Sequence, residues 1–149
     1  LPAPTTNSAP TAFTSKSDSI SLHSLMAQLR KTVVITGGGS GIGAATAQLL
    51  YKLDYRLVLI GKDREGLDAI QRELGSDPDL SNAQDTQKTA EKISSSFKEV
   101  YGLINNAGVY PFGGLQTTDS QAWDACLATN LSAAFLLAKA LSPEMARAG

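Results

Sequence analysis

From Lys31 onward, short runs of β-branched and aliphatic residues alternate with stretches in which apolar residues recur at helical spacing. The runs Thr32–Thr36 and Arg56–Ile60 have the composition of buried strands. Between them, apolar residues at helical spacing predict a helix with Ile42, Ala45, Leu49 and Leu53 on one face. This alternation is typical of β-α-β units, so we expect an α/β fold with a parallel sheet.

The same patterns continue toward the end of the chain. A second helix is predicted from Leu67, Ile70 and Leu74, and it ends at Gly75. A third helix is predicted from Ala90, Ile93, Phe97 and Val100, and a short strand follows over residues 102–105. Between Leu74 and Asp79 the chain offers mainly turn-forming residues, so we expect the strand that would follow the second helix to be missing or vestigial.

A long helix is expected after residue 117. Thr118 and Gln121 have the spacing of a capping box, which favours a helix start at this point. We expect Pro143 to lie near the end of the helix. Its predicted buried face consists of Trp123, Leu127, Leu131, Ala134, Phe135, Ala138 and Leu141.

The first 25 residues differ from the rest of the chain. They are rich in Ser, Thr, Pro and Ala and have no sustained apolar periodicity, so we expect a disordered leader over residues 1–25. The folded domain is then expected over residues 26–149. Without a secretory signal the expected location is the cytoplasm, and a transit peptide to an organelle is the alternative, although no Arg precedes Arg30.

Composition narrows the classes of partner. The net charge of −1 gives no electrostatic reason to expect nucleic acid or an anionic membrane, and no apolar run approaches the roughly 20 residues of a membrane span. One histidine, His23, and one cysteine, Cys126, do not make a metal site or an intrachain disulfide. We expect Cys126 to be a buried small apolar residue rather than a nucleophile.

A glycine-rich loop joins the first strand to the first helix. Glycines permit positive φ and allow a ligand to approach the backbone closely, and the following helix N-terminus suits a pyrophosphate. A tight turn without a ligand is the alternative, but so many glycines would cost folding entropy that such a turn does not require. The candidate binding residues of the loop are Thr36, Gly37, Gly39, Ser40, Gly41, Ile42 and Gly43.

Three asparagines form a second candidate binding region, after the glycine loop. Asn105 and Asn106 end a predicted strand at its carboxyl edge, where ligands bind in open α/β sheets. Their amides could connect neighbouring strands or hold a ribose, or they could form a polar turn. Asn130 lies on an apolar helix face, so it should make defined hydrogen bonds unless it is solvated at the edge of that face.

These motifs together resemble the short-chain dehydrogenase/reductase family, whose glycine motif is T-G-x-x-x-G-x-G. The run Asn105-Asn106-Ala107-Gly108 matches the N-N-A-G of the family, and Trp123 and Asn130 follow at the family spacing. The resemblance covers Lys31 to Gly149 and implies a Rossmann-like, doubly wound parallel sheet that binds NAD(P) in an oxidoreductase of alcohols and carbonyls. By this resemblance Asn106, Ala107 and Gly108 also contact the cofactor, Asp79 and Leu80 contact its adenine, and Asn130 belongs to the catalytic tetrad. A methyltransferase with a similar glycine loop is disfavoured, because it gives no reason for these asparagines.

The choice between the two dinucleotides is expected at the end of the second strand. An Asp or Glu there would bind the 2′-hydroxyl of NAD and repel the 2′-phosphate of NADP. The resemblance places Gly61 at this position, and Lys62 follows it. We therefore expect NADP to be preferred, with NAD as the alternative; the competing interpretation is that Lys62 is a solvated loop charge.

The proton-transfer pair of the family is missing from the sequence. The family uses a Ser, and a Tyr with a Lys four residues after it, whereas residues four positions after the tyrosines here are Tyr55, Leu59, Asn105 and Gly114. The resemblance implies that strands five to seven are also absent and that this chain is inactive alone. The predicted strand over residues 102–105, which corresponds to the fourth strand of the family, would then lie at an exposed edge of the sheet. Through this edge the chain could form a homo-oligomer or act as a non-catalytic interaction module.

Overall fold

The computed structural model describes residues 30–62, 80–97, 99–110 and 113–149. In this part of the chain three parallel strands form one sheet in the order β2-β1-β3. The strands are β1 (Thr32–Thr36), β2 (Arg56–Ile60) and β3 (Val100–Ile104). The expected α/β fold with a parallel, Rossmann-like sheet is therefore confirmed, and the first two strands begin and end where the sequence pattern predicted.

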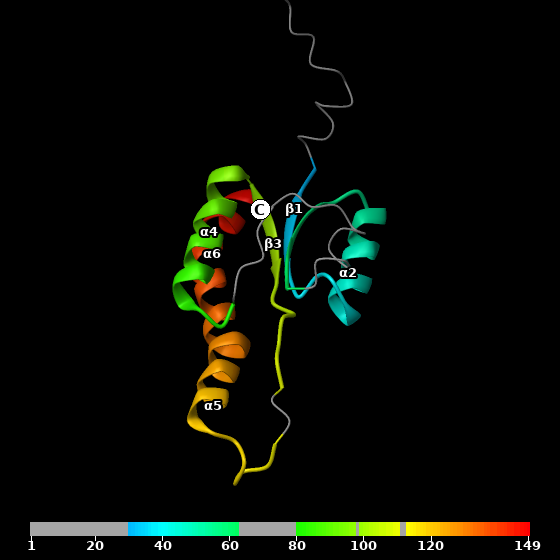
Figure 1. Cartoon of the computed structure of the whole chain (residues 1–149). Coiled ribbons are helices and arrows are strands. Elements are labelled where there is room, and N and C mark those ends of the chain that lie inside the picture. Colours follow the sequence, from blue (N-terminus) through cyan, green and yellow to red (C-terminus); the bar gives the residue numbers. More distant parts are fainter. Residues whose placement is uncertain (1–29, 63–79, 98, 111–112) are drawn as a thin grey trace, which may run out of the picture.

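Helices cover both faces of this sheet. The helix α2 (Gly41–Lys52) lies on one face, and α4 (Ala83–Ser96) and α6 (Ala133–Ala148) lie side by side on the other (Figure 1). Successive side chains of a strand point to opposite faces, so each strand contributes to two apolar clusters. Val34, Val58 and Ile60 pack toward α4 and α6, whereas Val33, Ile35, Leu57 and Leu59 pack toward α2.

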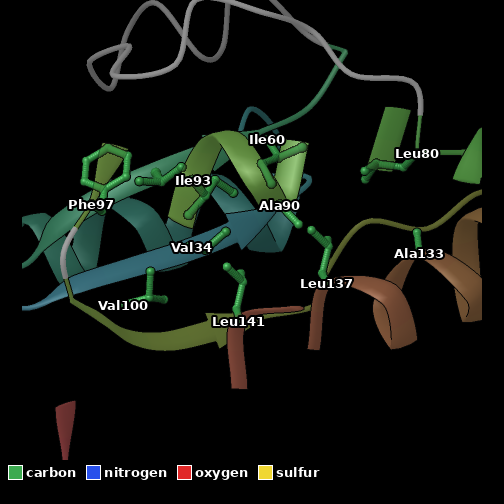
Figure 2. Packing of buried hydrophobic residues seen from close by; sticks show 11 residues of the cluster. Val34, Ile60, Leu80, Ala90, Ile93, Phe97, Val100, Ala133, Leu137 and Leu141 are labelled. Atoms are coloured by element: carbon green, nitrogen blue, oxygen red, sulfur yellow. The ribbon is translucent and has the colours of Figure 1, made fainter. Parts of the chain in front are cut away.

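The larger cluster holds α4 and α6 against the sheet. Figure 2 shows Ile93 of α4 and Leu137 and Leu141 of α6 meeting at Val34 of the central strand. All four side chains are fully buried. Burial of an aliphatic side chain of this size contributes about 1.5–3 kcal/mol, so this cluster fixes the layer of helices behind the site.

The third strand begins earlier than predicted. Val100 belongs to β3 and not to the preceding helix, because α4 ends at Ser96 and Phe97 already has extended backbone angles. The expected strand over residues 102–105 instead ends at Ile104. Its pairing with β1 shifts by one residue at Tyr101, which is a β-bulge in the strand at the edge of the described sheet. The ammonium of Lys31 lies 3.9 Å from the centre of the Tyr101 ring.

The long helix near the end of the chain differs from the prediction at its start. It starts at α5 (Ser120–Leu127), whose N-cap is Asp119 and not Thr118, because the Asp119 carboxylate accepts a hydrogen bond from the Ala122 N–H at 2.7 Å. Pro143 lies inside α6 and near its end, as expected, with another turn of helix beyond it.

The predicted buried face of this helix is largely wrong. A π-helical turn, η1 (Ala128–Ser132), separates α5 from α6. After this turn the buried side chains are Ala133, Leu137, Leu141 and Glu144. Of the seven residues of the predicted face, only Leu141 is buried. The other large apolar side chains of that face are exposed: Trp123, Leu127, Leu131 and Phe135.

The first helix also buries a face other than the predicted one. Gly43 and Ala47 of α2 are buried, whereas Ile42, Leu49 and Leu53 are exposed. Small residues on the inner face allow α2 to lie close to the sheet. Other expectations fall outside the described residues: the leader over residues 1–25, the helix with Leu67, Ile70 and Leu74, the vestigial strand near Gly75, and Asp79.

The continuous helix Ser120–Ala148 is long and apolar enough to cross a membrane when length and composition alone are considered, although no such run was recognised in the sequence. Of its most apolar window, 22% is buried inside the structure. The second half of the helix packs against β3 and α4 through Leu137 and Leu141. One side of this helix is therefore part of the packed α/β domain.

Candidate functional site

The site is built at the carboxyl edge of the sheet. Thr36 lies opposite Ile60 in the register, and Ile35 lies opposite Ile104, so all three strands end at the same level. The chain passes from β1 to β2 on one side of it and then crosses back to β3 on the other side. Open α/β sheets bind ligands at such a point, because the connections leave the sheet in opposite directions and a crevice opens between them.

The glycine loop turns tightly between β1 and α2. Gly37 and Gly41 have φ of +65° and +52°, a left-handed conformation that favours glycine. Gly43 is buried, and a Cβ atom on it would overlap the carbonyl oxygen of Gly37 and approach the amide nitrogen of Asn106. The N–H of Gly37 donates to the Ile60 carbonyl at 2.6 Å, which fixes the loop against β2.

Asn106 and Thr36 connect this loop to the end of β3. The Asn106 amide donates to the carbonyl oxygens of Thr36 and Gly37 at 3.0 and 3.1 Å. In return the Thr36 hydroxyl accepts from the N–H groups of Asn106 and Ala107 at 3.0 and 2.9 Å. Of the alternatives open for Asn106, the structure shows a connection between neighbouring strands, and this connection fixes the two loops of the site relative to each other.

The N-terminus of α2 lacks a side-chain cap. Ser40 is the N-cap residue, but its hydroxyl makes no capping hydrogen bond, and the first turn contains no acidic residue. By contrast, the side chain of Asn82 caps α4 through two backbone N–H groups. The first-turn N–H groups and the partial positive charge of α2 are therefore directed at the mouth of the loop, which is where an anion is stabilised.

A pocket of about 260 Å³ lies over this helix end. Its walls come from the glycine loop, from the loop after β2, from the turn before α4, from the loop after β3 and from the π-helical turn. The lining residues are Gly37, Gly39, Ser40, Gly61, Lys62, Leu80, Ser81, Ala107, Gly108, Val109 and Thr129.

Eight of the residues proposed from the sequence line this pocket: Gly37, Gly39, Ser40, Gly61, Lys62, Leu80, Ala107 and Gly108. Thr36, Gly43 and Asn106 lie behind it and support its walls. Gly41 begins α2, and Ile42 beside it is 79% exposed and does not line the pocket. Asp79 lies outside the described residues.

Ser81, Val109 and Thr129 also line the pocket but were not among the candidate site residues predicted from the sequence. Val109 directly follows the run Asn105-Asn106-Ala107-Gly108, so its position was available from that motif. Thr129 comes from a helix, and helical periodicity alone did not bring it to the pocket. Thr129 lies in the π-helical turn, next to Asn130, which makes hydrogen bonds with Val109 in the loop after β3.

Asn130 lies in the same π-helical turn and holds the loop after β3. Its side-chain oxygen accepts from the Val109 N–H at 2.7 Å, and its amide nitrogen donates to the Val109 carbonyl at 2.8 Å. The expectation that Asn130 makes defined hydrogen bonds is confirmed, although its side chain is exposed. We call this pair of hydrogen bonds the Asn130–Val109 clamp. These contacts use the oxygen and one N–H of the Asn130 side chain to hold the loop after β3, and the expected membership of Asn130 in a catalytic tetrad stays a prediction.

Comparison with known proteins adds to this geometry. Residues 31–149 match the family described as short chain dehydrogenase. The chain is 32% identical over 127 residues to D-threitol dehydrogenase of Mycolicibacterium smegmatis, a match that covers 80% of this chain and 49% of the relative. It is 35% identical over 115 residues to the human 3-oxoacyl-[acyl-carrier-protein] reductase, covering 74% and 48% of the two chains.

A solved structure shares the fold. The crystal structure of a metagenomic short-chain oxidoreductase in complex with NADP superposes with a TM-score of 0.73 at 37% identity, covering 81% of this chain and 58% of that one. The chain thus spans about half the length of the curated relatives it matches. The structure has a parallel sheet with a T-G-x-x-x-G-x-G turn at its carboxyl edge, and residues 31–149 match the family model. The chain therefore belongs to the short-chain dehydrogenase/reductase family of oxidoreductases.

Proposed function

We propose that this chain binds a nicotinamide dinucleotide, with NADP preferred over NAD, and that it is the cofactor-binding portion of an oxidoreductase of alcohols and carbonyls. The observation that carries the proposal is the uncapped N-terminus of α2, which opens into a pocket lined by glycines and by Lys62. Family membership supports the class of cofactor. The preference for NADP rests on the residues at the end of β2.

The residues of the pocket fit the phosphate-bearing half of a dinucleotide. Gly39 and Ser40 present backbone at the helix N-terminus, where a pyrophosphate would accept hydrogen bonds from N–H groups. Leu80 and Ser81 form a wall with one apolar and one polar side chain, suited to a nucleobase. The volume of about 260 Å³ is at the small end for ligand pockets, so we expect it to hold part of the dinucleotide.

The preference for NADP rests on charge at the end of β2. Gly61 stands where a carboxylate would repel a 2′-phosphate, and Lys62 lines the pocket beside it. An ammonium group near the phosphate strengthens binding of the dianion relative to the neutral hydroxyl of NAD.

When bound, the nicotinamide supplies hydride chemistry. What the described residues contribute is binding and orientation: the glycine loop and α2 hold the phosphates, and the Asn130–Val109 clamp fixes the wall formed by the loop after β3. The sequence contains no Tyr with a Lys four residues after it, so the family's means of transferring the substrate proton is missing here. We therefore propose that the 149-residue chain does not catalyse turnover by itself.

Titration of the chain with NADPH and NADH, followed by coenzyme fluorescence, tests both parts of the proposal. We expect NADPH to bind more tightly, and we expect Lys62→Ala to weaken NADPH binding roughly tenfold with little effect on NADH. Lys52→Ala, which removes an exposed lysine at the other end of α2, is the matched control. Equal binding of NADPH to wild type and Lys62→Ala refutes the NADP preference, and absence of binding of either coenzyme refutes the function.

A second candidate function is favoured by one observation. In the described sheet β3 is an edge strand, and the exposed side chains of Trp123 and Phe135 lie on the helix that follows it in the chain. An unpaired edge beside exposed apolar surface favours association with a second copy of the chain. On this proposal the chain is a non-catalytic dinucleotide-binding or interaction module. Sedimentation equilibrium tests it: a concentration-dependent dimer supports the module, and a monomer at all concentrations refutes it.

A further inference from the structure

The thiol of Cys126 lies beside the Asn130–Val109 clamp. Cys126 is in α5, four residues before Asn130, and is partly buried. Its sulfur is 3.6 Å from the carbonyl oxygen of Val109, to which the S–H donates, and 3.4 Å from the amide nitrogen of Asn130, from which it accepts. The thiol therefore contacts both partners of the clamp.

The hydrogen-bonding capacity of Asn130 explains what the sulfur adds. A side-chain amide has two N–H donors and one oxygen. The oxygen accepts from the Val109 N–H, and one donor is used by the Val109 carbonyl. The second donor is used by the sulfur of Cys126. With an aliphatic side chain at position 126, this donor would lose its acceptor, and one constraint on the orientation of the amide would disappear.

We propose that Cys126 is a positioning residue whose thiol completes the Asn130–Val109 clamp and thereby fixes the wall of the pocket formed by the loop after β3. Val109 lines that pocket, as does Thr129, which is the residue before Asn130. The sulfur acts on the pocket through Asn130 and Val109. Cys126 is partly buried and not fully buried as expected, and on this proposal its thiol acts through hydrogen bonds. The effect on the pocket rests on the proposed function, whereas the effect on the clamp does not.

Three substitutions separate hydrogen bonding from packing. Cys126→Val fills the position with apolar groups, although it is larger and β-branched, and it has neither a donor nor an acceptor. Cys126→Ser keeps both, on a smaller atom with a shorter bond to Cβ, so we expect partial rescue. Cys126→Ala removes the sulfur without adding bulk, and it replaces the valine variant in the comparison if valine disturbs the helix. Because the chain has one cysteine, no other thiol contributes to the comparison.

Hydrogen exchange of the Val109 amide in the full chain, without coenzyme, is the direct test. We expect exchange about tenfold faster in Cys126→Val and Cys126→Ala and about threefold faster in Cys126→Ser, the range expected for one hydrogen bond. The side-chain N–H signals of Asn130 should shift in the valine and alanine variants and remain near their wild-type positions with serine. Ser142→Ala, which removes a side-chain hydrogen bond to the Lys139 carbonyl elsewhere on the long helix, should change neither measurement.

The contrast between serine and the apolar variants decides the proposal. Equal protection of Val109 in wild type and Cys126→Val would overturn it, as would exchange with serine as fast as with alanine. Amides of Ile93 and Leu141 report on the core, and equal acceleration there would show a loss of packing and would count against a local role. If Val109 responds as expected but wild type binds neither NADPH nor NADH, the positioning role stands and the proposed function fails.

Discussion

Thr36 and Asn106, which are 70 residues apart in the sequence, exchange hydrogen bonds at the carboxyl edge of the sheet. The Thr36 hydroxyl accepts from the Asn106 backbone N–H at 3.0 Å, and the Asn106 side chain donates to the Thr36 carbonyl, also at 3.0 Å. Through this exchange the ends of β1 and β3 hold the glycine loop in place. The predictions below test the loop, the pocket and the core that supports them.

Thr36→Val should destabilise the domain by about 2 kcal/mol, because it leaves the N–H groups of Asn106 and Ala107 without the hydroxyl that accepts from both. The side chains have nearly the same shape, and Thr36 is 2% exposed, so the effect reports hydrogen bonding in a buried site. Urea unfolding followed by circular dichroism measures it. Thr36→Ser keeps the oxygen and should lose less than half as much; an equal loss with serine would assign the effect to the methyl group.

Gly43→Ala should destabilise the domain by about 3 kcal/mol or more, because the added Cβ overlaps the carbonyl of Gly37 and crowds the side chain of Asn106. Binding of coenzyme should fall with it, since the loop must move to make room. The control is Gly114→Ala, where a Cβ would meet no atom within 4 Å. Thermal unfolding compares the two variants, and similar midpoints would contradict the close approach of Gly43 to Gly37.

Gly61→Asp should reverse the proposed coenzyme preference. A carboxylate at the end of β2 would accept a hydrogen bond from the 2′-hydroxyl of NAD and repel the 2′-phosphate of NADP. We expect NADPH affinity to fall roughly tenfold, about 1.4 kcal/mol, and NADH affinity to rise. Fluorescence titration at two salt concentrations checks this, since the repulsion should weaken as salt is raised. Gly61→Ala is the neutral control, and an equal loss of NADPH affinity with alanine would indicate a steric effect.

Glu144→Met should stabilise the domain by about 1–2 kcal/mol. Glu144 is 9% exposed on the inner face of α6, and its Oε2 atom is buried without a hydrogen-bond partner among the described residues. Burial of a carboxylate oxygen without a partner is unfavourable, and Met offers similar length with an apolar end. Urea unfolding at neutral pH measures the change. Glu91→Met on the exposed side of α4 should stay within about 0.5 kcal/mol of wild type. A loss of stability in Glu144→Met would show that the carboxylate is needed.

The sequence predicted β1, β2 and the glycine loop because their signals are local. A run such as Thr32–Thr36 favours an extended buried strand through its own side chains, and glycine is needed at Gly37 because of its backbone conformation. The order of these elements was sufficient to place Gly61 and Ala107 at one edge of the sheet, since parallel strands end on the same side.

The sequence did not predict which helix faces are buried. Trp123, Leu127, Leu131 and Phe135 are spaced by four residues and predicted a buried face, yet all four are exposed. No side chain of α5 is buried, and after the π-helical turn the buried apolar positions of α6 are Ala133, Leu137 and Leu141, on a different face from Phe135. The packing of α6 against β3 and α4 selects this face, and apolar spacing alone does not. The start of β3 at Val100 was missed for a related reason, because a residue three positions after Phe97 fits a helical period as well as a strand.

By itself, then, the sequence determined the α/β class, the first two strands and the glycine turn, because backbone conformation and the two- and 3.6-residue periods are set by neighbouring residues. The tertiary structure decided the rest of the site. Contacts between Asn106 and Thr36, and among Asn130, Cys126 and Val109, join residues from separate elements. Such contacts depend on how the helices and strands pack in space, and no local pattern of hydrophobic and polar positions specifies them.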